Sequence, residues 1–269
     1  MWLPEVGVKN IIAIGGGHLG EHRDTYDFGP DSDSEFLPWD TRSIDELVIE
    51  STGKPNPRVL VVATAREDSP RHDIDQYLDA FTSSYESLGA SVERLQLLPK
   101  VLANSDIERR VAAADAVYVS GGNTKRMIAT WKRYGLGGLL QKAYDSGTVM
   151  SGLSAGSIAW FAYGNSNSHY SDKPFRVTAL GWFPAIVCPH YDVEPFRQEP
   201  FKKMVKQSGM VGLAIDETAA IQIVNDTDYR VLSSGGQATV SKCSWKQNEY
   251  FVEPLAPGSS GKLADLLSA

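Results

Sequence analysis

A five-residue segment near the middle of the chain has the residue types of a serine nucleophile and its turn. Gly152-Leu153-Ser154-Ala155-Gly156 directly follows the apolar run 148–151, and Ser157–Tyr163 reads as the start of a helix. A serine in a tight turn between strand and helix needs small neighbours, because the two elements approach closely there. Its hydroxyl then lies at the helix N-terminus, where free N–H groups stabilise negative charge. The segment predicts that Ser154 is a nucleophile and that the Ala155 N–H is an oxyanion donor.

A serine at its ordinary pKa needs a base that removes its proton. The chain has five histidines, and His190 is the best placed of them because it follows the apolar run Ala185–Cys188. Sites in parallel sheets form at the carboxyl ends of the strands. His169, in a polar segment after the nucleophile helix, is a weaker candidate. We therefore expect His190 to be the base.

The third group should be a carboxylate that orients the histidine. In α/β-hydrolases the order is serine, acid, histidine, but Asp172 is the only carboxylate between Ser154 and His190, and no histidine comes later. The order serine, histidine, acid is therefore expected, with Asp216 or Glu217 as the acid, just past the next apolar run. These observations leave the two tied. Two local alternatives follow the histidine directly: Asp192 and Glu194.

Two other patterns point to different chemistry but lack the context that it requires. His18-Leu19-Gly20-Glu21-His22 matches the H-x-x-E-H pattern of inverted zinc peptidases, which needs both histidines on one helical face. Gly20 and the polar residues that follow make a helix there unfavourable. Gly15-Gly16-Gly17 lacks the spacing of a dinucleotide-binding loop and is typical of a tight turn. We expect no metal and no organic cofactor, and we expect Cys188 to be a buried core thiol.

Alternating strand and helix patterns surround these residues. Most of the expected strands are continuous apolar runs, as in parallel strands that are covered on both faces: Asn10–Ile14, Arg58–Ala63, Ser91–Leu95, Ala116–Val119, Thr148–Ser151, Ala185–Cys188 and Val211–Ile215. Helical spacing occurs between them, in Asp75–Leu88, Asp106–Ala113, Thr124–Trp131 and Leu136–Asp145. The alternation predicts an α/β fold with a doubly wound, mostly parallel sheet.

The C-terminal part has a different pattern. Short strands separated by turn residues predict antiparallel hairpins appended to the sheet: Ala219–Val224, Tyr229–Leu232, Ala238–Ser241 and Glu249–Val252. Two polar segments, Gly20–Thr41 and Tyr163–Pro174, are predicted to be loops, and loops of this length are often functional. No repeat or linker is evident, so residues 1–269 are expected to form a single domain.

Composition and charge limit the classes of protein to consider. The chain has 269 residues, of which 42% are hydrophobic, so a sizeable core is expected. It has neither an apolar run of about 20 residues, as a transmembrane helix requires, nor a secretory signal pattern. A net charge of −7 argues against binding to nucleic acid. The two cysteines fit a reducing compartment, so we expect a cytoplasmic protein.

Four short motifs together resemble the peptidase E family of serine peptidases, which includes aspartyl dipeptidases and to which cyanophycinase is related. The motifs are Gly121-Gly122-Asn123-Thr124, Gly152-Leu153-Ser154-Ala155-Gly156, Cys188-Pro189-His190-Tyr191 and Asp216-Glu217. The resemblance extends from about Ile11 to Gly236. The segments 152–161 and 188–194 are closer to a divergent, uncharacterised bacterial branch.

This resemblance implies a flavodoxin-like fold related to class I glutamine amidotransferases. It also implies a catalytic triad of Ser154, His190 and Glu217, which favours Glu217 over Asp216. The N–H of Gly122 would be the second oxyanion donor. A homodimer is a further expectation from the family.

The resemblance further implies that the substrates are short peptides, including Asp-Xaa dipeptides. An acidic first residue needs a cation, ideally an arginine, and Arg176 and Arg197 are the candidates. Asn123 is a third candidate for a substrate contact. Two alternatives remain: hydrolysis of another amide or isopeptide, as in cyanophycinase, and a catalytically silent binding or regulatory module.

Overall fold

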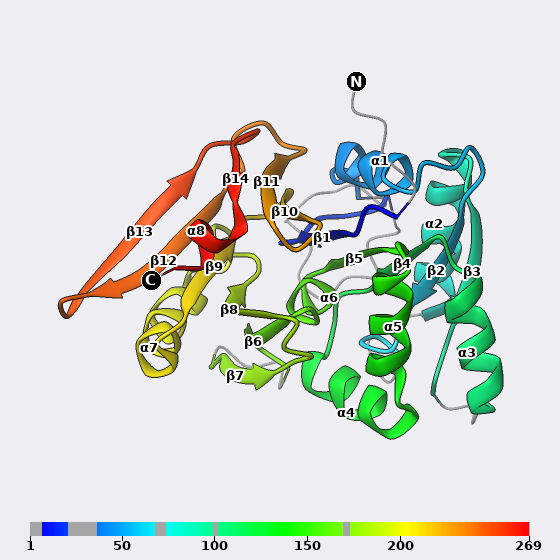
Figure 1. The fold of residues 1–269 in the computed structure, drawn as a ribbon, viewed down its shortest axis with the longest axis horizontal. Coiled ribbons are helices and arrows are strands. Elements are labelled where there is room, and N and C mark those ends of the chain that lie inside the picture. The colour runs from blue at the N-terminus through cyan, green and yellow to red at the C-terminus, as the bar shows by residue number, and fades with distance from the viewer. Residues whose placement is uncertain (1–6, 21–36, 68–73, 99–101, 169–172, 269) are drawn as a thin grey trace.

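A computed structural model of the chain describes residues 7–20, 37–67, 74–98, 102–168 and 173–268. These residues form two β-sheets with helices packed against them (Figure 1). The larger sheet has eight strands in the order β14-β11-β10-β1-β5-β4-β2-β3, and the smaller has six in the order β13-β12-β9-β8-β6-β7.

Five neighbouring strands of the larger sheet are parallel to one another. They are β1 (Asn10–Ile14), β5 (Val149–Leu153), β4 (Ala116–Val119), β2 (Arg58–Val62) and β3 (Ser91–Leu95). Three antiparallel strands extend the sheet beyond β1, namely β10 (Ala219–Val224), β11 (Asp228–Ser233) and β14 (Ser260–Lys262). The parallel strands other than β3 are almost completely buried, which agrees with their continuous apolar sequences.

Helices cover both faces of this sheet. One group is α1 (Arg42–Glu50) and α2 (Ile74–Ser87), and the other is α3 (Asn104–Ala113), α4 (Thr124–Tyr134) and α5 (Leu136–Asp145). Ile44 and Phe81 of the first group share a buried cluster with Val59 of β2. Met127 and Leu140 of the second group share another cluster with strand residues whose side chains point to the opposite face of the sheet. Alternate residues of each strand therefore bury against different helices.

The smaller sheet contains the second half of the strand-and-helix pattern. Its strands are β6 (Phe161–Ser166), β7 (Phe175–Thr178), β8 (Phe183–Cys188), β9 (Val211–Ile215), β12 (Val240–Lys246) and β13 (Glu249–Leu255). Of these, β6, β8 and β9 are parallel. A 3-10 turn, η2 (Pro195–Arg197), leads into α7 (Gln198–Ser208), which packs Phe201 and Val205 against this sheet. The short helices α6 (Ala155–Ile158) and α8 (Leu263–Leu267) complete the described elements.

The expected doubly wound sheet is confirmed only in part. Every strand segment predicted from an apolar run is a strand, and the tail forms antiparallel pairs as expected. However, β8 and β9 belong to the second sheet, so the prediction of one continuous sheet was wrong. An apolar run shows that a strand is buried but not which strand it pairs with. One buried cluster includes residues of both sheets, such as Val119 of β4 and Val187 of β8.

The prediction of a longer helix after the nucleophile was also wrong. Helix α6 ends at Ile158, and β6 begins at Phe161 within the segment that had been expected to be helical. Trp160 and Phe161 are completely buried, but both lie beyond the end of that helix. The segment 163–174 was expected to be a loop, yet its first residues belong to β6 and its last residues precede β7; residues 169–172 lie outside the described part. Residues 21–36 of the other predicted loop lie outside it as well.

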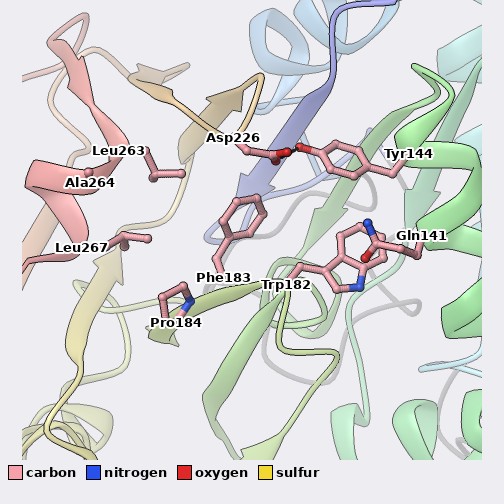
Figure 2. Close-up of a pocket in the computed structure, with 9 residues that line it drawn as sticks. All are labelled: Gln141, Tyr144, Trp182, Phe183, Pro184, Asp226, Leu263, Ala264 and Leu267. Carbon is pink, nitrogen blue, oxygen red and sulfur yellow. Dashed lines mark hydrogen bonds between the residues drawn. The ribbon is translucent and has the colours of Figure 1, made fainter.

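A hollow with a volume of about 480 Å³ lies between α5, the start of β8 and α8 (Figure 2). Tyr144 and Trp182 stack on one side of it with ring centroids 5.4 Å apart, and the Tyr144 hydroxyl donates to Asp226 at 2.6 Å. None of the residues predicted to be catalytic lines this hollow. No helix within the described residues is long and apolar enough to cross a lipid bilayer.

Candidate active site

Ser154 lies at the end of β5 in a strained backbone conformation. Its φ is 55° and its ψ is −106°, values that residues other than glycine rarely adopt. The Ser154 N–H donates to the Ile14 carbonyl of the neighbouring strand at 3.0 Å. A Cβ on Gly152 would lie 2.7 Å from the Gly156 carbonyl group, so strand and helix are in direct backbone contact. Glycine is therefore required two residues before and two residues after this serine.

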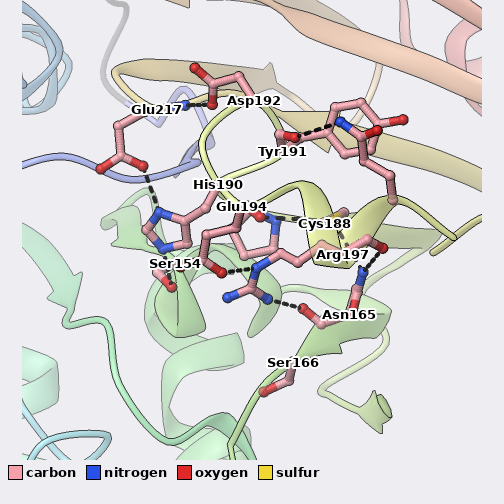
Figure 3. Close-up of polar contacts among 12 residues, drawn as sticks. Ser154, Asn165, Ser166, Cys188, His190, Tyr191, Asp192, Glu194, Arg197 and Glu217 are labelled. Carbon is pink, nitrogen blue, oxygen red and sulfur yellow. Dashed lines mark hydrogen bonds and ion pairs between the residues drawn. The ribbon is translucent and has the colours of Figure 1, made fainter. Parts of the chain in front are cut away.

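His190 follows β8, as predicted, and also has a positive φ, 54°. Its ring lies between a serine and a carboxylate (Figure 3). The Nε2 atom is 2.9 Å from Ser154 Oγ, and the Nδ1 atom is 2.6 Å from Glu217 Oε2. The three side chains thus form one hydrogen-bonded line. A neutral imidazole that donates from Nδ1 to the carboxylate has its Nε2 lone pair directed at the serine hydroxyl.

Glu217 and Asp216 follow β9, and their side chains have different partners. The Glu217 carboxylate contacts His190, whereas the Asp216 carboxylate accepts the Thr239 N–H at 3.0 Å. Asp192, one of the local alternatives, accepts the main-chain N–H of Glu217 at 2.8 Å. The geometry therefore distinguishes the two carboxylates that residue type and spacing left tied, and the one beside the histidine is Glu217, which the resemblance favours.

Electrostatics favour an ionised Glu217. Burial by itself raises the pKa of this carboxyl group, but the charge and hydrogen bond of His190, with contributions from His18 and Arg197, lower the pKa below its ordinary value. Burial raises the pKa of Asp216 instead, an effect that Asp192 increases and the Thr239 N–H opposes. Of the two acids, Glu217 is the one whose surroundings favour the anion that can stabilise a protonated histidine.

The glycines after β1 lie against the histidine and its carboxylate. A Cβ on Gly16 would overlap both the Glu217 carboxylate and the His190 ring. The Gly16 carbonyl also accepts the Thr218 N–H at 3.0 Å, which ties it to the residue after Glu217. The spacing of Gly15–Gly17 predicts only a tight turn. Their position at the end of a strand was the signal that could have indicated a role in the site.

Gly122 and Ala155, whose N–H groups are the predicted oxyanion donors, lie in the two turns beside Ser154. Gly122 has a φ of 132°, and no carbonyl in the described part of the chain accepts its N–H. Ala155 is the first residue of α6, a position whose N–H has no partner within the helix. Gly121 lies beside the nucleophile, since a Cβ there would be 3.3 Å from Ser154 Cβ. Both predicted donors thus lie at strand ends next to the serine.

Asn123 supports this loop with both ends of its side chain. Its Oδ1 accepts the Arg126 N–H at 3.0 Å and caps α4. Its Nδ2 donates to the Ser168 carbonyl at 3.0 Å, and its main-chain N–H donates to Ala65 at 2.8 Å. These bonds hold the loop that carries Gly122, and a substrate contact by Asn123 stays a prediction.

The two arginines considered for the substrate lie in different surroundings. Arg176, on β7, is exposed, and its guanidinium lies 4.7 Å from the centroid of the Tyr163 ring. Arg197 is 2% exposed, forms an ion pair with Glu194, and donates to the Asn165 carbonyl at 2.9 Å.

Other candidate chemistry finds little support in the structure. Glu21 and His22 of the zinc-like pattern lie outside the described residues, and the described residues include no metal-binding cluster of histidine, cysteine or carboxylate side chains. Cys188 is buried, and burial raises the pKa of its thiol to about 12. A thiol with this pKa is protonated at neutral pH and is a poor nucleophile.

Comparisons with known proteins relate this chain to peptidases. The model of peptidase family S51 matches residues 34–231 of the 269. The chain is 28% identical to the uncharacterized peptidase YgaJ of Bacillus subtilis, over 92% of this chain and 97% of that protein. It is also 28% identical to peptidase E of Shewanella amazonensis, over 44% of this chain and 48% of that one.

A solved structure has the same fold. The crystal structure of a peptidase from an acI-B1 actinobacterium superposes with a TM-score of 0.73, covering 98% of this chain and all of that one at 17% identity. The family match extends over most of the chain and includes the serine turn, the Gly122 loop, His190 and Glu217. The chain therefore belongs to peptidase family S51, and it is a serine peptidase of the peptidase E group.

Proposed function

We propose that this protein hydrolyses short peptides through an acyl-enzyme, with Ser154, His190 and Glu217 as its catalytic triad. The hydrogen-bonded line from Ser154 Oγ through the His190 ring to Glu217 is the observation that carries the proposal. A second support is the positive φ of both Ser154 and His190, because strained residues cluster at functional sites.

Each catalytic step uses a group already in place. His190 Nε2 takes the proton of Ser154 as Oγ attacks the peptide carbonyl, and the resulting oxyanion accepts bonds from the Gly122 and Ala155 N–H groups. The protonated histidine, stabilised by Glu217, then gives its proton to the leaving amine as the C–N bond breaks. Water, deprotonated by the same nitrogen, then attacks the acyl group. The histidine returns this proton to Ser154 Oγ as the ester C–O bond breaks, which releases the acid and restores the serine.

An Asp-Xaa dipeptide is the specific substrate to test, since relatives of this chain are named peptidase E. Its acidic side chain would need a cation beside the acyl group. Arg197 is already paired with Glu194, and Arg176 is exposed on β7. Neither arginine has contacts that identify it as the cation for an acidic side chain. We therefore propose short peptides as a class of substrate.

The direct test of the triad is covalent labelling of Ser154 with a fluorophosphonate probe. We expect wild-type protein to be labelled and Ser154→Ala protein to be inert. Ser146→Ala, which alters a serine at the end of α5 whose hydroxyl donates to the Lys142 carbonyl of the same helix, should leave labelling unchanged. A folded wild-type protein whose Ser154 does not react would refute catalysis and support a binding module.

A dipeptide panel with varied first residues then defines the substrate. Turnover restricted to peptides that begin with aspartate identifies an aspartyl dipeptidase, and broad turnover identifies a general dipeptidase. A protein that is labelled yet cleaves none of these peptides would instead act on another amide or isopeptide.

A further inference from the structure

The loop that carries His190 begins at the end of β8 and ends at α7. His190 has a φ of 54°. A residue with a side chain keeps this strained conformation only when neighbouring contacts hold it. Two main-chain bonds shape the loop: the Glu194 N–H donates to the His190 carbonyl at 3.0 Å, and the Arg197 N–H donates to the Glu194 carbonyl at 3.0 Å. Glu194 therefore links the histidine to Arg197.

Arg197 fastens this loop to the neighbouring strand β6. Its Nε donates to the Glu194 carboxylate, and its Nη1 donates to the Asn165 carbonyl at 2.9 Å (Figure 3). In return, the Asn165 side-chain Nδ2 donates to the Arg197 carbonyl at 2.9 Å and lies 3.2 Å from Cys188 Sγ. Since β6 pairs with β8, these bonds close a ring between the strand before His190 and the turn after it.

Burial makes this arrangement specific to arginine. The side chain is 3% exposed, and a buried guanidinium is tolerated only when its charge is paired and its N–H groups have acceptors. Glu194 supplies the negative charge, and the Asn165 carbonyl supplies a second acceptor. A lysine could retain the charge but could not make both bonds in this geometry.

We propose that Arg197 is a positioning residue that holds the His190 loop in its strained conformation, and that it is not the cation that recognises an acidic substrate. The proposal depends on the proposed function of Ser154 and His190. Its core is the pair of bonds by which Arg197 joins Glu194 to the backbone of Asn165. Loss of these bonds leaves Ser154 and Glu217 in place but lets the histidine move away from the serine hydroxyl.

The experiment compares Arg197→Gln, Arg197→Lys and Glu194→Gln with Arg230→Gln as the matched control, since Arg230 is an exposed arginine on β11 of the other sheet. The readout is the rate at which a neutral fluorophosphonate labels Ser154, because this probe has no acidic side chain. We expect Arg197→Gln to slow labelling about 30-fold or more, since small displacements of catalytic groups cost this much or more. Arg197→Lys should be intermediate, Glu194→Gln should also be slow, and Arg230→Gln should match wild type.

A role in substrate binding gives the opposite pattern. Arg197→Gln would then be labelled at the wild-type rate, and only the KM for peptides with an acidic first residue would rise. Glu194→Gln would release the arginine for the substrate and would not slow labelling. Either result overturns the proposal.

Hydrogen exchange of the full chain separates this proposal from the proposed function. We expect Arg197→Gln to speed exchange of the main-chain amides in segment 190–197 about tenfold or more while the amides of β9 remain protected, because local opening exposes only the freed loop. Unchanged exchange in segment 190–197 would refute the positioning role, whether or not Ser154 reacts. If wild-type protein is not labelled but the loop still opens in the variant, the proposed function fails and the structural role of Arg197 stands.

Discussion

Replacing Glu217 with glutamine tests how much the carboxylate contributes to catalysis. The substitution preserves the size of the side chain but removes the negative charge that lies 2.6 Å from His190 Nδ1. It also permits an amide N–H to face Nδ1, which would favour the wrong tautomer of the imidazole. Both effects weaken the histidine as a base.

The expected magnitude follows from the geometry. At an effective dielectric constant of about 20, unit charges at this separation attract each other by about 6 kcal/mol. The glutamine dipole retains part of this interaction, so we expect a loss of about 3–5 kcal/mol of transition-state stabilisation, which corresponds to roughly 10²- to 10⁴-fold in rate.

The assay is the rate of fluorophosphonate labelling at pH 7 with the probe in excess, and the control is Asp216→Asn. Asp216 precedes Glu217 directly but accepts the Thr239 N–H, so its amide variant should be labelled within about threefold of the wild-type rate. Thermal unfolding of each variant ensures that the proteins compared are folded.

The reasoning would be refuted if Glu217→Gln reacted nearly as fast as wild type. It would also be refuted if Asp216→Asn were slowed as much as Glu217→Gln. The second result would assign the orienting role to Asp216.

Three further predictions follow from other contacts. Gly16→Ala should slow labelling about 100-fold because the new Cβ overlaps the His190 and Glu217 side chains. Gly138→Ala, whose new Cβ faces open space, should be labelled at the wild-type rate, and equal labelling rates for the two variants would contradict this prediction. Asn123→Ala removes the cap of α4. It should therefore lower the free energy of unfolding in urea titrations by roughly 1 kcal/mol, and an unchanged midpoint would exclude that role. Burial raises the pKa of Glu67 to about 7 even though its carboxylate accepts two main-chain N–H groups. The folded protein therefore keeps Glu67 protonated at pH values at which the unfolded chain has already lost the proton. This bound proton stabilises the folded state at low pH, and the stabilisation is lost as the pH rises from 4.5 to 7. The free energy of unfolding of wild type, measured relative to Glu67→Gln, should therefore fall by about 2–3 kcal/mol over that range, and a constant difference would refute the raised pKa.

Much of the secondary structure could be predicted from local pattern. The continuous apolar runs are strands because each strand is covered on both faces, and the helical segment Leu136–Asp145 has the predicted bounds. The segment after Ser154 could not be predicted in this way. Its serine turn correctly predicts a helix start, but Trp160 and Phe161 are buried where α6 gives way to β6. A short apolar stretch does not distinguish the end of a helix from the start of a strand.

Asn165 and Arg197 show a second kind of limit. Nothing in their spacing indicates that an arginine on a 3-10 turn donates to the carbonyl of a strand residue 32 positions earlier. That contact exists because β6 and β8 are paired and the turn folds back against them. The sequence therefore offers Arg197 only as a candidate cation for the substrate, whereas its burial and its hydrogen-bond partners show that it holds the loop together.

Sequence by itself determined the residue types and their places at strand ends. It indicated Ser154 from its turn and His190 from the strand before it. Residue type and spacing left Asp216 and Glu217 equivalent, because adjacent residues share the same strand end, and the preference for Glu217 came from the family resemblance alone. The tertiary structure gives the physical basis for that preference, since the Glu217 carboxylate faces the histidine. It also decided that the serine comes from the eight-stranded sheet while the histidine and glutamate come from the six-stranded one. The physical reason is that pairing between strands and packing between sheets are long-range choices, which a local pattern of apolar and polar residues does not encode.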